Sequence, residues 1–478
     1  QRILEHLAEA WNDQVARGNA ALRLAAQEIV LTVPASFDAA ARELTVEAAK
    51  AAGFENLTLL EEPQAAVYAF IESTGDAWRK QLKPGDVLLV VDIGGGTTDF
   101  SAIVAVDRDG SLALERVAVG DHILLGGDNM DLALAHTLRA KLAAQGKNVD
   151  RWQMLALTHQ SRAAKETLLS KDAPAAVPIA LSSRGSQLLG NTLRTELTHA
   201  DVTSLLVDGF FPQVESTARP ATRARAALTE LGLPYASDAA ITRHLAAFLG
   251  KQASALAREG ASPSMLMPTT LLFNGGVMKG DALRSRLVQT IDGWMHEHGA
   301  PRVRTLDGAD LDLAVARGAT AYGLARHGRG LRIRGGTARA YYVGIEGAMP
   351  AVPGLEPPLT ALCVAPFGME EGTVASLPPR EMGVVVGEPV RFRFFGSSVR
   401  RDDRAGAELE SWDPAELDEL APIEVTLPAE GRREGDVVPV RLSASVTPVG
   451  ILELAAVPTK PKVENERWQV ELSVRATE

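Results

Sequence analysis

Residues 91–99 read Val-Asp-Ile-Gly-Gly-Gly-Thr-Thr-Asp, and short apolar runs rich in β-branched residues lie on both sides of them. The runs cover residues 86–91 and 101–106, so the pattern predicts a hairpin with the glycines at its tip. Three glycines in a row remove every Cβ from that tip, and backbone N–H groups can then approach a phosphate closely. An ordinary Gly-rich turn is the alternative, but it has no need of flanking aspartates and threonines. The stretch therefore indicates a phosphate-binding loop.

Oxygen-bearing side chains flank these glycines. Thr97 offers a hydroxyl, and Asp92 and Asp99 offer carboxylates. Magnesium prefers oxygen ligands and keeps several of its waters in protein sites, so both aspartates can hold it through water. Together these residues predict a nucleotide site with a magnesium ion.

Composition narrows the class of protein. The 478 residues are 46% hydrophobic, which suffices for a large core, and usual domain sizes indicate about three domains. The net charge of −11 comes without a basic run, and the longest apolar runs, such as residues 87–91, are too short to span a bilayer. We therefore expect neither nucleic acid nor a membrane as a partner.

The cysteine content indicates the cellular compartment. The single cysteine, Cys363, excludes an internal disulfide framework and a cysteine-rich metal site. The N-terminus has no basic flank followed by an apolar core, so nothing directs the chain for export. We expect a cytoplasmic protein in which Cys363 is a small buried hydrophobe.

The chain changes character along its length. Residues 1 to about 330 alternate strand-like and helix-like segments, which predicts α/β layers, and residues 145–265 within them read as mainly helical. Residues from about 331 to 478 carry short β-rich runs between Pro and Gly clusters, which is typical of a β-sandwich. The charged segment 400–419 reads as a solvated loop to which we assign no chemistry.

A series of motifs follows one order along the chain. They are Leu-Thr-Val-Pro-Ala-Ser-Phe at 31–37, Leu-Glu-Glu-Pro-Gln-Ala-Ala at 60–66, the turn at 92–99, Gly-Asp-His-Ile-Leu-Leu-Gly-Gly-Asp-Asn-Met-Asp at 120–131, Ser-Arg-Ala-Ala-Lys-Glu-Thr-Leu at 161–168, Phe-Asn-Gly-Gly-Val-Met at 273–278 and Asp-Leu-Ala-Val-Ala-Arg-Gly-Ala-Thr-Ala-Tyr-Gly at 312–323. This order resembles that of the Hsp70 (DnaK-like) chaperone family of the actin-like ATPases. The resemblance implies an α/β actin-like ATPase domain followed by an all-β peptide-binding-like sandwich.

The resemblance assigns roles to single residues. It implies ATP or ADP and Mg²⁺ as cofactors, with both aspartates holding the metal through water. The implied catalytic residues are Glu62, Asp92, Thr97 and Asp99. The implied nucleotide-binding residues are Gly94, Gly95, Gly96, Thr97, Thr98, Gly126, Gly127, Asp128, Lys165, Gly275, Gly276 and Asp312.

Taken singly, several of these residues have simpler interpretations. The glycine pairs at 126–127 and 275–276 could each mark a close backbone contact or the start of a helix. Glu62, which precedes a proline, could be a surface carboxylate at a helix start, and Lys165 could be an ordinary solvated lysine. Their order is the stronger signal.

The chain also departs from the family pattern. Arg162 stands where members usually carry a glutamate that accepts hydrogen bonds from the ribose, and residues 277–279, Val-Met-Lys, replace the usual serine and arginine. Residues 330–337 read Gly-Leu-Arg-Ile-Arg-Gly-Gly-Thr instead of an acidic, leucine-rich linker. Within this sequence we expect no helical lid after the sandwich.

The resemblance gives domain boundaries. We expect an actin-like nucleotide-binding domain at 1–328, a linker at 329–340 and a β-sandwich at 341–478. No second Asp-x-Gly-Thr hairpin occurs in the sequence, and the chain begins with glutamine. We therefore expect a complete second lobe but an incomplete first lobe that lacks its N-terminal hairpin and first subdomain.

An incomplete lobe has a physical consequence. Its sheet would keep only the strands at 29–33 and 57–60, and one of them would present an unpaired edge and an apolar face. We predict that this polypeptide alone is unstable or prone to aggregate. Hydrogen exchange that protects both strands as well as residues 87–91 would contradict this.

The function implied by the resemblance is a chaperone cycle. ATP binding and hydrolysis would be coupled to binding of extended apolar segments of unfolded proteins, with co-chaperones as possible partners. This chain alone is expected to be deficient in hydrolysis. A nucleotide-binding scaffold without turnover is the alternative, and an actin-like sugar kinase is a weaker one because a kinase has no need of the β-sandwich.

Overall fold

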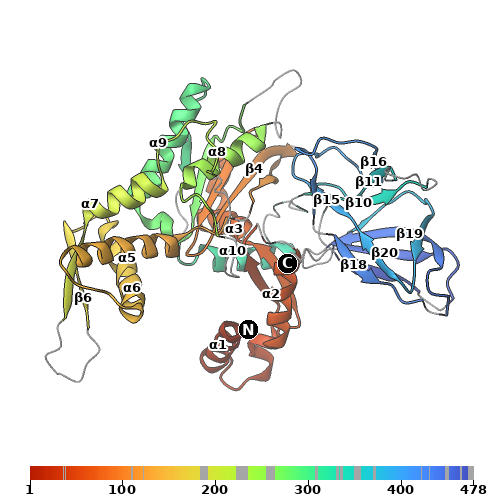
Figure 1. The fold of residues 1–478 in the computed structure, drawn as a ribbon, viewed down its shortest axis with the longest axis horizontal. Helices are drawn as coiled ribbons and strands as arrows, with labels where there is room; N and C mark the ends of the chain where they lie inside the picture. Colours follow the sequence, from red (N-terminus) through yellow and green to blue (C-terminus); the bar gives the residue numbers. More distant parts are fainter. Residues whose placement is uncertain are drawn as a thin grey trace.

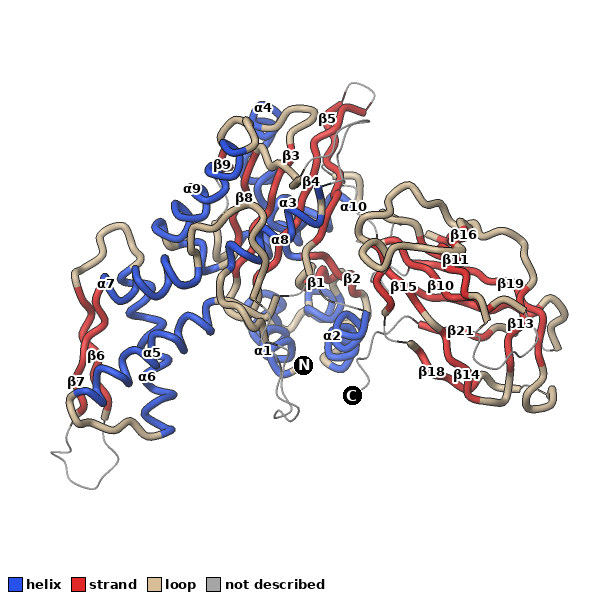
Figure 2. The backbone as a smooth tube through the Cα atoms, turned by 45° about the horizontal axis from the view of Figure 1, so that its top comes forward, coloured by secondary structure: helices blue, strands red, loops and turns tan. Residues whose placement is uncertain are grey.

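The computed structural model describes residues 1–35, 37, 39–108, 111–121, 123–182, 192–221, 235–253, 264–306, 310–329, 333, 337, 339–348, 357–369, 373–420, 422–429, 431–446, 452–462 and 466–471. Helices and strands alternate up to residue 326, and strands dominate from residue 340 onward. Figure 1 shows these two parts beside each other, and Figure 2 shows helices beside the strands of the first part. Among the described residues we find no helix with the length and hydropathy needed to cross a membrane.

The first part contains all the helices of the described chain. Its α-helices are α1 (Arg2–Trp11), α2 (Ala39–Ala51), α3 (Glu62–Thr74), α4 (Trp78–Gln81), α5 (Gly127–Ala144), α6 (Arg151–Leu168), α7 (His199–Val202), α8 (Ile241–Lys251), α9 (Asp281–Glu297) and α10 (Ala314–Arg326). Its 3₁₀ and π segments are η1 (Asn12–Ala16), η2 (Ala20–Leu22), η3 (Leu24–Ala26), η4 (Gly75–Ala77), η5 (Thr203–Phe210) and η7 (Gly276–Lys279). Its strands are β1 (Ile29–Val33), β2 (Leu57–Glu61), β3 (Val87–Ile93), β4 (Thr98–Arg108), β5 (Ser111–Val119), β6 (Ala176–Leu181), β7 (Leu193–Thr198), β8 (Thr270–Asn274) and β9 (Arg304–Leu306).

A mixed sheet forms the centre of this part. Its strand order is β5-β4-β3-β8-β9, with β3 antiparallel to β4 and parallel to β8. Asp92 lies opposite Asp99 across the β3–β4 pair, so the hairpin predicted from residues 91–99 is confirmed. The sheet therefore places the glycine turn at one end of two adjacent buried strands.

Both faces of this sheet are covered. Leu89 and Val91 of β3 belong to one core cluster together with residues of α5, α8 and α9. Leu88 and Val90 belong to a second cluster, with residues of α3 and α10. Because successive side chains of a strand point to opposite faces, burial on both sides explains why β3 reads as a nearly continuous apolar run.

Helices α3 and α10 cross at close range. A Cβ added to Gly318 would overlap the backbone of Ala65, so the crossing requires a glycine there. The rings of Tyr68 and Tyr322 pack beside it, with centroids 5.4 Å apart. This contact fixes the position of α3, which begins at Glu62.

Two smaller sheets lie outside the central one. Strands β1 and β2 form a two-stranded parallel sheet, which confirms the strands expected at 29–33 and 57–60, and most of β1 is only half-buried. Strands β6 and β7 form an antiparallel hairpin, so the prediction that residues 145–265 are mainly helical is wrong in this segment. Exposure alternates along β7, with Arg194 and Glu196 exposed, as in a half-buried strand.

The second part is a β-sandwich. Its strands are β10 (Ala340–Glu346), β11 (Leu359–Ala365), β12 (Val374–Ala375), β13 (Met382–Val385), β14 (Pro389–Phe392), β15 (Phe394–Ser397), β16 (Glu408–Leu409), β17 (Asp418–Glu419), β18 (Ile423–Thr426), β19 (Val437–Val446), β20 (Leu452–Pro458) and β21 (Trp468–Glu471). One sheet has the order β16-β11-β10-β15-β17, and the other has β12-β19-β20-β21 with β13 also paired to β19. Strands β14 and β18 form a separate pair.

The sandwich tests two sequence expectations. Cys363 is fully buried, as predicted. The segment 400–419 is not a plain solvated loop, because β16 and β17 lie in it and Arg400 forms ion pairs with Asp403 and Glu416, both at 2.8 Å. Most of the linker expected at 329–340 lies outside the described residues.

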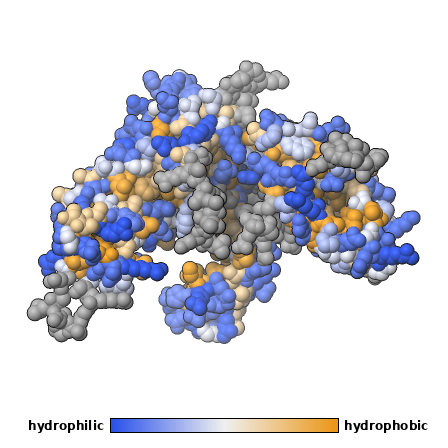
Figure 3. Space-filling view, in the orientation of Figure 1, coloured by the Kyte–Doolittle hydropathy of each residue, from blue (hydrophilic) through white to orange (hydrophobic). Residues whose placement is uncertain are grey.

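Figure 3 shows hydrophilic and hydrophobic residues interspersed over the visible face of the molecule.

Candidate functional site

The glycine turn joins the end of β3 to the start of β4. The N–H of Gly94 donates to the Thr97 carbonyl at 2.9 Å, which closes the turn. Gly95 and Gly96 are exposed, so a ligand oxygen can reach their backbone. The turn thus has the open, Cβ-free tip that phosphate binding requires.

The start of α5 rests directly on this turn. The N–H groups of Gly127 and Asp128 donate to the carbonyls of Gly94 and Gly95, at 3.0 and 2.8 Å. A Cβ on Gly126 would lie 2.6 Å from the Gly95 oxygen, closer than Cβ atoms are found in proteins, so the contact requires glycine. The pair at 126–127 therefore serves as both a close backbone contact and a helix start, and the positive end of α5 favours a nearby anion.

The loop after β8 also touches the turn. Gly275 has a φ of 84°, and a Cβ there would overlap the Ile93 carbonyl and lie 2.8 Å from Asp92 Oδ1. Gly276 begins η7, and a Cβ on it would meet nothing within 4 Å. Sterics thus fix Gly275 as glycine but leave Gly276 open.

The two threonines of the turn have different surroundings. Thr98 is fully buried, and its hydroxyl donates to the Leu125 carbonyl at 2.7 Å. Its N–H donates to the Ile123 carbonyl at 3.0 Å. Thr97 is only half-buried. The Thr98 side chain therefore anchors the turn from below, while Thr97 remains the threonine that a ligand can reach.

Three carboxylates lie close together behind the turn. Asp92 and Asp99 are buried, and Asp92 Oδ2 accepts a hydrogen bond from Asn274 Nδ2 at 2.8 Å. Burial, together with the nearby charges of Asp92 and Asp99, raises the pKa of Glu62 to about 7. Burial and Asp99 also raise the pKa of Asp92 to about 6, against the opposing effect of the Asn274 hydrogen bond. The cluster therefore holds mutually repelling acids with little solvent to screen them.

This cluster fits a hydrated magnesium ion. A divalent cation would relieve the repulsion that raises both pKa values. In the described part of the chain, no group of three or more His, Cys, Asp or Glu side chains is arranged to hold a metal directly. Mg²⁺ commonly keeps waters and takes its remaining ligands from phosphates, so Asp92 and Asp99 would suit an ion held through its waters.

Glu61, the neighbour of Glu62, belongs to a buried ion-pair triad. Its Oε1 lies 2.7 Å from Arg42 Nη2 of α2, and its Oε2 contacts Arg116 Nη1 of β5. All three side chains are at most 12% exposed. The triad joins α2 and β2 to the central sheet at the residue before Glu62. The sequence alone did not reveal it, because Arg42 and Arg116 are distant along the chain and meet only in the fold.

A second ion-pair group forms where α6 packs against the start of α5. Lys165 Nζ lies 2.6 Å from Asp131 Oδ1 and donates to the Gly127 carbonyl at 3.3 Å. Arg162 Nε donates to Asp131 Oδ2 at 2.9 Å, and its guanidinium also contacts Asp128. Lys165 is buried, which rules out the solvated interpretation. Asp131 was not among the predicted site residues, although its position one helical turn after Gly127 could have indicated it.

The remaining predicted residue lies at the edge of the site. Asp312 pairs with Lys279 across an exposed contact. Lys279 ends η7 and Asp312 precedes α10, so the pair spans from the end of the Gly275 loop to the start of that helix. The structure thus joins the glycine turn, the start of α5, Lys165 and the Gly275 loop through direct contacts, and links Asp312 to them through Lys279.

Comparisons with known proteins agree with this arrangement. Residues 8–226 match the family model described as Hsp70 protein, a range that includes the glycine turn, the start of α5 and Lys165. The chain is 39% identical over 145 residues to the chaperone protein HscA homolog of Aeromonas salmonicida, a match that covers 30% of this chain and 20% of the relative. It is 35% identical over 193 residues to the HscA homolog of Methylococcus capsulatus, covering 40% and 28%.

Coverage of the relatives is partial. The chain is also 40% identical over 132 residues to the chaperone protein HscA of Pectobacterium carotovorum, covering 28% of this chain and 20% of the relative. The matched part thus spans about a fifth to three tenths of the length of these relatives. The family match over residues 8–226, these relatives and the assembly of the motifs around one turn together support a divergent member of the Hsp70 family.

Proposed function

We propose that this chain binds ATP or ADP with Mg²⁺ at the glycine turn. In the whole protein, we infer, nucleotide binding and hydrolysis are coupled to binding of extended apolar peptides by the β-sandwich. One observation carries the proposal: the glycine backbones at 94–95, 126–127 and 275 meet beside the buried carboxylates of Asp92 and Asp99.

Each group in the site has its own task. The N–H groups of Gly95 and Gly96 would hold phosphate oxygens, and the dipole of α5 would favour their negative charge. Asp92 and Asp99 would hold the waters of Mg²⁺, which supplies positive charge to the phosphates. Glu62, whose pKa these two aspartates raise, would accept hydrogen bonds from the same water shell once deprotonated.

The residues of the second ion-pair group and its neighbours would form the nucleoside side of the site, where the adenosine would bind. Lys165, the Gly275–Gly276 loop and Asp312 would border the adenosine. Arg162 stands at the position of the ribose-binding glutamate and pairs with Asp128 and Asp131. Its guanidinium has no acceptor for the hydrogen bonds of the ribose hydroxyls. We therefore propose that this chain contacts the ribose differently from most members of its family.

Hydrolysis needs positioned charge on both sides of the γ-phosphate. The sequence holds one hairpin of this type, at 91–99. We therefore infer that the second lobe is represented in full and the first lobe in part, and that this chain alone is deficient in hydrolysis. We place the nucleotide-binding domain at 1–328, the linker at 329–340 and the sandwich at 341–478.

A quartet of charges supports coupling between the two parts. Asp121, which follows β5, and Asp418 of β17 alternate with Arg339 and Lys251. Arg339 lies 3.3 Å from Asp121 and 3.7 Å from Asp418, and Lys251 lies 3.7 and 3.9 Å from the same two carboxylates. The quartet joins the end of α8 to the sandwich. Such exposed pairs contribute little energy each, so a change in the nucleotide site can rearrange them.

Peptide affinity in two nucleotide states tests the coupling. A labelled extended apolar peptide should bind the whole protein with different affinity in ATP and in ADP, and the difference should shrink when Asp418 is changed to Ala. Equal affinities in both nucleotides would refute the coupling and leave nucleotide binding standing. Unfolded client segments and co-chaperones are the partners that we propose for the whole protein.

A nucleotide-binding scaffold without turnover is the second candidate. The presence of only one Asp-x-Gly hairpin favours it. Magnesium-dependent ATP turnover by the whole protein, stimulated by unfolded peptide, would decide for the chaperone. Tight nucleotide binding without turnover would decide for the scaffold.

A further inference from the structure

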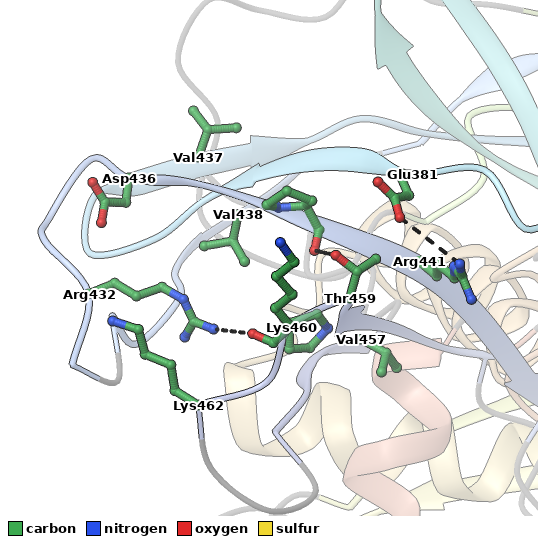
Figure 4. Close-up of a pocket in the computed structure, with 12 residues that line it drawn as sticks. Glu381, Arg432, Asp436, Val437, Val438, Arg441, Val457, Thr459, Lys460 and Lys462 are labelled. Atoms are coloured by element: carbon green, nitrogen blue, oxygen red, sulfur yellow. Dashed lines mark hydrogen bonds and ion pairs between the residues drawn. The ribbon is translucent and has the colours of Figure 1, made fainter.

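A recess opens on the outer face of the sandwich sheet that contains β13, β19 and β20 (Figure 4). Its volume is about 740 Å³, within the usual range for ligand sites. Along β19, Val438 and Val440 point into the core while Val437, Pro439 and Arg441 point outward. The recess is therefore separate from the sandwich core and from the nucleotide site.

Small side chains on the floor and two loops joined by hydrogen bonds explain why this face has a recess. Pro439 forms part of the floor, and its neighbour across the β13–β19 pair is Gly383, which has no side chain. The loops 431–436 and 459–462 form the rim. Lys462 Nζ donates to the Gly431 carbonyl at 2.7 Å, and Arg432 Nη2 donates to the Lys460 carbonyl at 3.4 Å. Because the two loops hold each other, the recess is formed before any ligand arrives.

Two of the cations around the recess are already neutralised. The Arg432 guanidinium pairs with the fully buried Glu466 and lies over the Trp468 ring, 5.3 Å from its centroid. Arg441 lies 4.0 Å from Glu381. These residues shape the walls rather than attract an anion.

The two lysines of the rim carry the unbalanced charge. Within the described residues, the Lys460 ammonium makes no ion pair or hydrogen bond, and that of Lys462 donates only to the Gly431 carbonyl. The nearby Asp436 accepts the Arg433 N–H at 3.0 Å and keeps its negative charge, which offsets one of the two lysine charges. The recess thus gathers positive charge on a protein whose net charge is −11, and a concave site focuses such a field.

Apolar surface adjoins these lysines. Val437 is 65% exposed and Val457 is 41% exposed, and both line the recess. A small anion would use the lysines and leave both valines in water. A ligand that carries carboxylates and an apolar side chain together would cover both features.

We propose that this recess binds an extended acidic peptide segment. Its carboxylates would contact Lys460 and Lys462, and an apolar side chain would pack on Val437 and Val457. Clusters of basic side chains recognise acidic motifs in this way. The site differs in chemistry from the apolar peptide site proposed above and needs no nucleotide, so the two proposals fail independently.

Fluorescence anisotropy on the full chain tests the proposal. The probe is a fluorescein-labelled peptide of four Glu-Glu-Val repeats, and a Lys-Lys-Val peptide of the same length is the control ligand. The charge reversal Lys460→Glu with Lys462→Glu should weaken binding about tenfold at low salt, because two contacts become repulsive. The pair Lys80→Glu with Lys83→Glu, on an exposed segment of the first part, changes net charge equally and should alter affinity less than about twofold.

Circular dichroism melting establishes that every variant is folded. A further variant, Val437→Asp, should weaken the acidic probe without affecting the melting transition, because Val437 is exposed. Equal weakening by both lysine pairs would refute the proposal and indicate non-specific attraction. Absence of binding by the unaltered chain would also refute it, as would competition by inorganic phosphate at the affinity of the peptide.

Discussion

The proposed phosphate side and the proposed nucleoside side of the site are built by different means. On the phosphate side, backbone meets backbone, and Gly126 and Gly275 occupy positions where a Cβ would collide with the chain. On the nucleoside side, side chains meet in ion pairs around Asp131 and Asp312. Close backbone contact admits one residue type, whereas ion pairs can be rearranged. The chain accordingly keeps the family pattern on the first side and departs from it at Arg162 on the second.

The largest change in stability is expected from a substitution on the nucleoside side. Lys165→Met should lower the free energy of unfolding by about 4 kcal/mol, because it removes the buried partner of the buried Asp131. Arg162→Met should cost less than about 1 kcal/mol, since its side chain is 53% exposed and Lys165 still neutralises Asp131. Urea unfolding of both variants measures the difference. Equal losses would mean that burial does not separate the two pairs.

A glycine substitution is expected to disrupt the backbone contacts of the phosphate side. Gly126→Ala should destabilise the chain by about 3 kcal/mol, because the added Cβ would lie 2.6 Å from the Gly95 carbonyl oxygen. Gly293→Ala in α9 is the control, since a Cβ there meets nothing within 4 Å, and it should stabilise by about 0.5 kcal/mol through helix propensity. Thermal unfolding compares them. A harmless Gly126→Ala would show that the start of α5 does not rest on the turn.

The carboxylates behind the turn predict a pH dependence. Glu62 ionises near pH 4.5 in the unfolded chain and near pH 7 in the folded one, so the folded state holds the extra proton between these values. Stability should therefore fall by about 2 kcal/mol as the pH rises through this window. Glu62→Gln should remove most of the fall, whereas Glu72→Gln, an exposed position on the same helix, should leave it unchanged. Denaturant midpoints at pH 5 and 8 measure it, and an unaltered slope in Glu62→Gln would assign the effect to other groups.

The smallest effect is expected at the edge of the nucleoside side. Lys279→Met should change stability by less than about 0.5 kcal/mol, because its pair with Asp312 is exposed. Differential scanning calorimetry at low and high salt resolves this. A loss several times larger would show that the pair supports the Gly275 loop rather than merely bordering it.

The local sequence pattern predicted the hairpin at 91–99 but did not reveal the ion pairs around Asp131. Residues 91–99 form a hairpin whose strands and turn are adjacent in sequence, so composition alone indicated it. Asp131 went unnoticed because its partner, Lys165, comes from another helix, and only packing of α5 against α6 brings them together. The Glu61 triad escaped prediction for the same reason.

The strands within residues 400–419 escaped prediction for a related reason. Strands β16 and β17 are two residues long each and exist because longer strands on the same sheet supply their partners. A charged, two-residue segment carries no periodicity of its own, so the sequence of 400–419 read as loop. Tertiary contacts, rather than local preference, determine such elements.

Titration calorimetry of the chain with ADP tests the central claim most directly. The account predicts binding that Mg²⁺ strengthens, and loss of that dependence in the variant Asp92→Asn with Asp99→Asn, which should remain folded because it relieves repulsion between buried acids. If the folded chain binds no ADP, or binds it equally with Mg²⁺, with a chelator and in the double variant, then the glycine turn is not a magnesium-nucleotide site.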